Sequence, residues 1–139
     1  MQAVVLAAGR GVRLRPITEK IPKAMVEIKG RPMLEHVLDR VISAGITDIK
    51  LVVGYKREVI EEHFGPEYSG AKLSYFVQEP PKGTAHALSL VENYVTERFL
   101  LSNSDMIARP ENYAMLASES EYERADALIM ARQVDDPWR

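Results

Sequence analysis

The chain has 139 residues, 46% of them hydrophobic and 27% charged, which is typical of one globular domain with a hydrophobic core. It has no cysteine, no apolar run long enough to span a membrane and no secretory leader pattern, so we expect a cytoplasmic protein without disulfides. The net charge of −2 argues against general binding to nucleic acid.

Apolar runs and helical periodicities alternate along the sequence. The apolar runs predict strands over residues 3–6, 25–28, 48–53, 72–77, 99–101 and 127–131. Apolar residues at helical spacing predict helices over residues 33–42, 56–64, 84–95 and 111–121, the first ended by Gly45. This alternation predicts an α/β fold, with a Rossmann-like, doubly wound, mostly parallel sheet and helices on both faces.

The first predicted strand runs directly into a turn of small residues. Ala7, Ala8, Gly9 and Gly11 carry so little side chain that their backbone N–H groups can approach a ligand closely. Leu14 stands where the P-loop and dinucleotide-binding patterns each require a glycine, so the spacing excludes both. For the glycine pair alone, an ordinary strand-to-helix turn with solvated arginines remains the alternative.

Basic residues gather just after this turn. The segment from Arg10 to Arg31 holds seven of the 18 basic residues and two of the 20 acidic ones, so it carries +5 and the remainder −7. Positive charge around a glycine turn in a mildly acidic chain favours a polyanion, most simply a phosphate chain.

Two more polar stretches follow predicted strands. Gln78 precedes a Gly83-Thr84 turn that opens a helix, and its amide can donate and accept hydrogen bonds. Asp105 ends an apolar strand, where its carboxylate can take Mg²⁺. Since the carboxyl ends of parallel strands share one edge of the sheet, both stretches are expected beside the glycine turn. Taken singly, they could also be a capped helix and an Asp turn.

The segment LAAGRGVRLRPITEKIPKAMVEI resembles the opening of the sugar-1-phosphate nucleotidylyltransferases, approximately L-A-G-G-x-G-T-R-L-x-P-x-T-x-x-x-P-K-x-M/L. The matching residues are Leu6, Gly9, Gly11, Arg13, Leu14, Pro16, Thr18, Pro22 and Lys23. Val12 departs from the usual Thr or Ser, which removes a hydroxyl and keeps the backbone N–H. Ser104 departs from the Gly that usually precedes the metal-binding Asp.

The resemblance implies transfer of a nucleotidyl group from UTP or dTTP to a sugar-1-phosphate, giving an NDP-sugar and pyrophosphate. It implies that Arg13 holds the β,γ-phosphates, that Lys23 bridges the α-phosphate and the sugar phosphate, and that Asp105 places Mg²⁺. The implied nucleotide-binding residues are Leu6, Ala7, Ala8, Gly9, Gly11, Val12, Arg13, Gln78, Gly83 and Thr84. The five-residue spacing from Gln78 to Gly83 favours UTP or dTTP over GTP.

The family's catalytic domain is longer than this chain, so residues 1–139 are expected to be its nucleotide-binding part, incomplete at the C-terminus. Two alternatives remain open: a non-catalytic nucleotide-binding or regulatory module, and a nucleotidylyltransferase for a non-sugar phosphate such as choline phosphate. The sequence does not define the sugar or the oligomeric state, and a homo-oligomer stays open. His86 follows the Gly83-Thr84 turn closely enough to approach a ligand.

Overall fold

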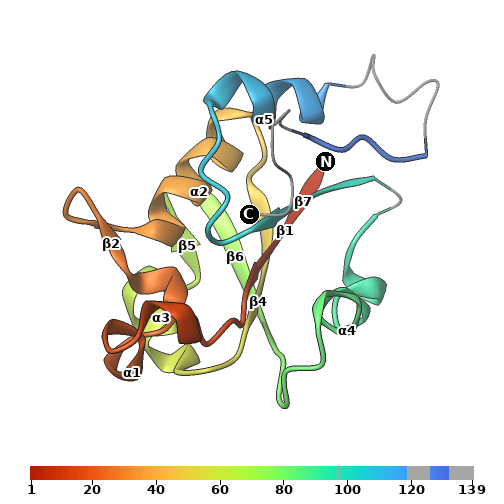
Figure 1. Cartoon of the computed structure of the whole chain (residues 1–139). Helices are drawn as coiled ribbons and strands as arrows, with labels where there is room; N and C mark the ends of the chain where they lie inside the picture. Colours follow the sequence, from red (N-terminus) through yellow and green to blue (C-terminus); the bar gives the residue numbers. More distant parts are fainter. Residues whose placement is uncertain (97, 119–125, 132–139) are drawn as a thin grey trace.

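The computed structural model describes residues 1–96, 98–118 and 126–131. Their main sheet has five strands in the order β5-β6-β4-β1-β7 (Figure 1). These strands are β1 (Gln2–Ala7), β4 (Asp48–Val53), β5 (Glu67–Tyr68), β6 (Ala71–Val77) and β7 (Phe99–Asn103). All pairings are parallel except that of the short edge strand β5 with β6. The predicted mostly parallel sheet is therefore confirmed.

Helices cover both faces of this sheet. One face carries α2 (Met33–Ser43), α3 (Arg57–Phe64) and α5 (Pro110–Ala117), and the other carries α4 (Thr84–Ser89) and the 3-10 turn η3 (Glu92–Tyr94) (Figure 1). Two separate clusters of buried side chains correspond to the two faces. The doubly wound arrangement predicted from the alternation is thus present.

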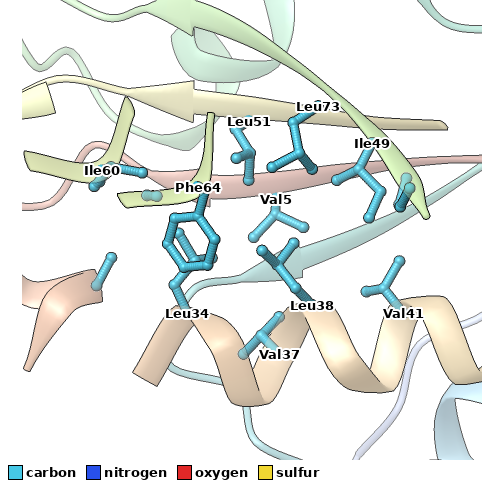
Figure 2. Packing of buried hydrophobic residues seen from close by; sticks show 14 of the residues in the cluster. Val5, Leu34, Val37, Leu38, Val41, Ile49, Leu51, Ile60, Phe64 and Leu73 are labelled. Carbon is cyan, nitrogen blue, oxygen red and sulfur yellow. The ribbon is translucent and has the colours of Figure 1, made fainter. Parts of the chain in front are cut away.

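The central strand β1 supplies side chains to both clusters. Val5 lies in the larger cluster and Val4 in the smaller one, and neither is exposed to solvent. A strand buried on both faces needs apolar residues at every position, which explains its continuous apolar run. In Figure 2, the Val5 side chain points from β1 toward α2, next to Leu38.

The helix α2 has the amphipathic pattern expected from its spacing. Leu34, Val37, Leu38 and Val41 are fully buried against the sheet (Figure 2). The helix ends where Gly45 adopts the left-handed conformation (φ 83°), which costs little in a residue without a Cβ.

The order of the strands reverses beside β1. The chain passes from β1 to β4 and β6 on one side and then returns to place β7 on the other side of β1. In open α/β sheets, ligands bind outside the carboxyl ends of the strands at such a reversal. The topology therefore puts the glycine turn after β1 and the polar loop after β7 on either side of the expected crevice.

The basic segment after β1 folds into short elements. They are η1 (Val12–Leu14), α1 (Ile17–Lys20) and η2 (Lys23–Met25), followed by a hairpin of β2 (Glu27–Ile28) and β3 (Arg31–Pro32). The extended segment predicted over 25–28 is therefore correct only at its end. The pairing of β5 with β6 was not predicted.

Two predicted helices are shorter than expected. The helix predicted over 84–95 ends at Ser89, because Val91 leaves the helical conformation (φ −108°, ψ 0°) while its side chain stays buried against the sheet. The helix predicted over 111–121 is α5, which ends at Ala117; residues 119–121 lie outside the described residues.

The strand predicted over residues 127–131 was wrong. These residues have no regular structure, and Ile129 is 86% exposed. A strand requires a partner for its backbone groups, and β7 pairs only with β1 among the described residues. No helix in the described part of the chain is both long and apolar enough to cross a membrane.

Candidate functional site

Four loops meet at the carboxyl edge of the parallel strands. The Ser104 N–H donates to the Leu6 carbonyl at 3.0 Å, which joins the start of the loop after β7 to the end of β1. Gly54, after β4, lies so close to its neighbours that an added Cβ would stand 2.9 Å from the Gln78 carbonyl and 3.1 Å from the Ala8 Cβ. The structure thus brings together the polar stretches that the sequence placed at this edge.

The glycine turn is fixed by the segment that follows it. Gly11 has φ 66°, and its carbonyl accepts a hydrogen bond from Thr18 Oγ1 at 2.8 Å. An added Cβ at Gly11 would stand 2.8 Å from Lys23 Cβ, inside contact distance. Glycine is required here both by the left-handed backbone and by the approach of Lys23. An added Cβ at Gly9 would meet no atom within 4 Å, so that side of the turn is open.

Lys23 and Asp105 form an ion pair across this edge. The Lys23 Nζ donates to the Asp105 carboxylate, although the two residues are 82 positions apart in the sequence. Their side chains are 32% and 37% exposed, so solvent or a ligand can reach both charges. Ser104, which precedes Asp105, is not among the residues with positive φ, so it occupies the usual Gly position without backbone strain.

Arg13 lies in η1 on the same basic segment as Lys23, two residues after Gly11. Its side chain is exposed, and it makes no hydrogen bond or ion pair with the other described residues. Of the three residues with predicted phosphate or metal roles, the structure therefore joins Lys23 to Asp105 and leaves the Arg13 guanidinium free for an anion.

Gln78 is a buried amide beside this edge, with 5% of its surface exposed. Its Nε2 donates to the Gly83 carbonyl at 2.9 Å and lies 3.1 Å from His86 Nδ1. Sequence reasoning found Gln78 and Gly83 but missed the contact with His86. The available signal was the position of His86 in the first turn of α4, three residues after Gly83.

Asp105 has the chemistry of a magnesium ligand, and the resemblance puts a second metal-binding Asp in the part of the family's domain beyond this chain. No group of three His, Cys, Asp or Glu side chains that could hold a metal occurs among the described residues. Mg²⁺ commonly takes one or two carboxylates and completes its octahedron with water and phosphate oxygens. A carboxylate that is 37% exposed, near the glycine turn, suits that type of coordination.

A second group of charges, the α2 network, lies away from this edge. Arg31 donates to Glu35 at 2.7 Å, to Asp39 at 2.9 Å and to the Tyr68 hydroxyl at 3.1 Å. Tyr68 donates to Asp39, and His63 Nε2 lies 2.8 Å from Glu35. Partial burial raises the pKa of Glu35, but the hydrogen bonds with His63 and Arg31 outweigh it and hold that pKa below its ordinary value.

A hollow of about 680 Å³ lies elsewhere, between β7, α5 and residues 126–130. Its lining is mainly apolar and includes Leu101, Tyr113 and Ile129. It contains neither the glycine turn nor the Lys23–Asp105 pair, so the candidate site is defined by converging polar groups and not by this hollow.

The chain belongs to the nucleotidyl transferase family, whose model matches residues 2–139. It is 44% identical over 135 residues to the UTP–glucose-1-phosphate uridylyltransferase AglF of Haloferax volcanii, covering 97% of this chain and 55% of the relative. It is 39% identical to the bifunctional protein GlmU of Methanococcus maripaludis, covering 99% of this chain and 31% of the relative.

A mannose-1-phosphate guanyltransferase of Saccharomyces cerevisiae is 36% identical, over 99% of this chain and 39% of the relative. The chain therefore spans about half the length, or less, of these curated relatives. Relatives named for uridylyl and for guanylyl transfer both match, so the comparisons do not decide the base.

Solved structures agree with the fold. A glucose-1-phosphate thymidylyltransferase from Bacillus anthracis superposes with a TM-score of 0.72 at 30% identity, covering 76% of this chain and 44% of that chain. A UDP-glucose pyrophosphorylase complexed with UDP-glucose also gives a TM-score of 0.72, at 25% identity, covering 89% of this chain and 54% of that chain.

Proposed function

We propose that this chain is the nucleotide-binding part of an enzyme that transfers a nucleotidyl group from UTP or dTTP to a sugar-1-phosphate. The observation that carries the proposal is the Lys23–Asp105 ion pair beside the glycine turn, at the reversal of strand order. Membership of the family and 44% identity to a named uridylyltransferase support it.

In this reaction, an oxygen of the sugar phosphate attacks the α-phosphorus of the nucleoside triphosphate. The bond from the α-phosphorus to the bridging oxygen breaks, and pyrophosphate leaves. The attacking oxygen is already anionic, so no general base is needed. The barrier arises from bringing anions together and from the charge of the transition state. Fixed positive charges in the site lower both contributions.

The residues divide this work by position. Backbone N–H groups from Ala8 to Val12 face the phosphates, and the free Arg13 guanidinium holds the β,γ-phosphates and the departing pyrophosphate. Lys23 lies between the α-phosphate and the incoming sugar phosphate. Asp105 would hold Mg²⁺, and the ion would supply positive charge to the phosphate oxygens.

Recognition of the nucleotide base is assigned to Gln78. The turn at Gly83 and Thr84 completes the part of the site that binds the base. The amide has the position that favours uracil or thymine in the resembling family. The partners are a nucleoside triphosphate and a sugar-1-phosphate, in a cytoplasmic setting, with no role for nucleic acid or membrane and the oligomeric state left open.

A pyrophosphate-release assay on the product of the intact gene tests this proposal. UTP and dTTP with glucose-1-phosphate or N-acetylglucosamine-1-phosphate should release pyrophosphate in the presence of Mg²⁺, and GTP should release far less. Nucleotide binding without pyrophosphate release would indicate a non-catalytic module instead. Release with choline phosphate in place of the sugar phosphates would overturn the assignment of the acceptor.

A further inference from the structure

The orientation of the Gln78 amide is fixed by its partners. The Gly83 carbonyl oxygen can only accept a hydrogen bond, so the Gln78 atom 2.9 Å from it is the amide nitrogen. The nitrogen has one further hydrogen, and His86 Nδ1 lies 3.1 Å away.

The second contact determines the state of the imidazole ring. To accept the remaining Gln78 hydrogen, His86 Nδ1 must carry a lone pair, so the ring proton resides on Nε2. His86 is half-buried in the first turn of α4, and its Nδ1 faces back toward the loop that carries Gln78. Both Gln78 amide hydrogens are then used inside the protein.

The Gln78 carbonyl oxygen is left as the group that can meet a ligand. It has no hydrogen-bond partner among the described residues. Arg40 Nε is the one fully buried side-chain nitrogen or oxygen there without a partner. The Gln78 Oε1 is therefore not sealed from solvent. Gln78 adjoins the glycine turn, because Gly54 packs between Gln78 and Ala8.

We propose that His86 is a positioning residue that occupies the second Gln78 N–H and so presents Gln78 to the base as a hydrogen-bond acceptor only. An acceptor matches a base with an N–H at the centre of its pairing edge, as in uracil, thymine and guanine. It opposes cytosine and adenine, which present a lone pair at that position. This inference rests on the proposed function, in which Gln78 meets the base.

Removal of His86 takes away one of the two hydrogen bonds that hold the Gln78 amide nitrogen away from the base, so that a rotated amide can donate an N–H to the ring nitrogen of cytosine. We expect His86→Ala to reduce the preference for UTP over CTP by about three- to tenfold, the scale of one net hydrogen bond. His86→Asn should restore most of the preference, since an Asn oxygen can occupy the position of Nδ1. His36→Asn is the matched control, because His36 contacts the Ile28 carbonyl and not Gln78.

The measurement is the ratio of dissociation constants for UTP and CTP, by calorimetry on the product of the intact gene and its variants. An unchanged ratio in His86→Ala, with UTP still bound, would overturn this inference alone. Failure of the wild-type product of the intact gene to bind any nucleotide would overturn the proposed function and, with it, the selection of the base.

The ring proton gives a readout independent of nucleotide. Proton–nitrogen correlation NMR on protein labelled with nitrogen-15 at its histidines should show the neutral His86 ring protonated on Nε2. The His86 signals are assigned by their loss in the His86→Asn variant. Protonation on Nδ1 would contradict the contact with Gln78 and remove the basis of the proposal.

Discussion

Two charged groups in this molecule differ in how fully they are paired. In the α2 network, Arg31 reaches Glu35, Asp39 and Tyr68, and His63 reaches Glu35, so that donors and acceptors from four elements satisfy one another. At the carboxyl edge, Lys23 and Asp105 form one partly exposed pair, and Arg13 has no partner among the described residues.

The difference shows that the number of charges does not mark a site. A network in which the charges compensate one another ties elements together and has little left to offer a ligand. Charges with unused pairing capacity, placed where strands end and the order of the sheet reverses, can bind one. Variants in the two groups should therefore separate losses of function from losses of stability.

The largest effect is expected for Lys23→Ala. In the intact enzyme, loss of this preorganised charge should lower turnover by about 100-fold or more, the scale for removing one such group. Lys72→Ala is the matched control. Lys72 is exposed near the amino-terminal end of β6, away from the carboxyl edge, so its removal should leave turnover unchanged. Near-wild-type turnover of the Lys23 variant would exclude its catalytic role.

Asp105→Asn should come next. The amide keeps the shape of the side chain but loses the negative charge that attracts a divalent cation. The Mg²⁺ concentration for half-maximal turnover should rise by at least about tenfold, since even outer-shell changes at metal sites have effects of that size. A metal titration that coincides with that of the wild type would exclude Asp105 as a ligand.

The next effect in size, smaller than those at Lys23 and Asp105, is expected for Gly11→Ala. Gly70→Ala is its matched control. Both glycines have positive φ (66° and 81°), so backbone strain alone should lower the free energy of unfolding by about 1 kcal/mol in each variant, and the crowding at Gly11 should add to that loss there. An added Cβ meets Lys23 at 2.8 Å only at Gly11, and nothing lies within 4 Å at Gly70. Gly11→Ala alone should therefore weaken nucleotide affinity as well; equal affinities in the two variants would show that Lys23 is not positioned by this turn.

The smallest effect is expected in the α2 network. The folded-state pKa of Glu35 lies below its ordinary value of 4.5, so its stabilisation is present above that pH and is lost as pH falls through the folded-state pKa. Glu35→Gln should lower the free energy of unfolding by about 1 kcal/mol or less at neutral pH, with turnover unchanged. In urea titrations the difference from wild type should shrink toward acid; a difference that grows there would contradict the assigned pairing.

The central part of the fold was predictable because its pattern is local. The periodicities of β1, β4 and α2 are determined by burial on two faces or one, and the structure keeps their bounds to within a residue or two. Residues 127–131 have an equally apolar pattern, but a strand also needs a neighbouring strand, which the local sequence does not reveal. The break at Val91 likewise depends on packing against the sheet.

The site was predictable in its composition and less so in its contacts. Strand order and the resemblance together put Lys23 and Asp105 at one edge, although they are 82 residues apart in sequence. The hydrogen bond between Gln78 and His86 depends on the conformation of the loop between them, which no motif specifies. Arg13 was predicted as a phosphate ligand, and that role stays a prediction.

The Lys23–Asp105 contact also has a thermodynamic consequence. While the two are joined, an anion arriving at Lys23 competes with a carboxylate, and a cation arriving at Asp105 competes with an ammonium group. The first of two oppositely charged ligands to bind releases the residue that the second one requires. Each ligand should then tighten the binding of the other by the same factor, so this one contact makes the site cooperative.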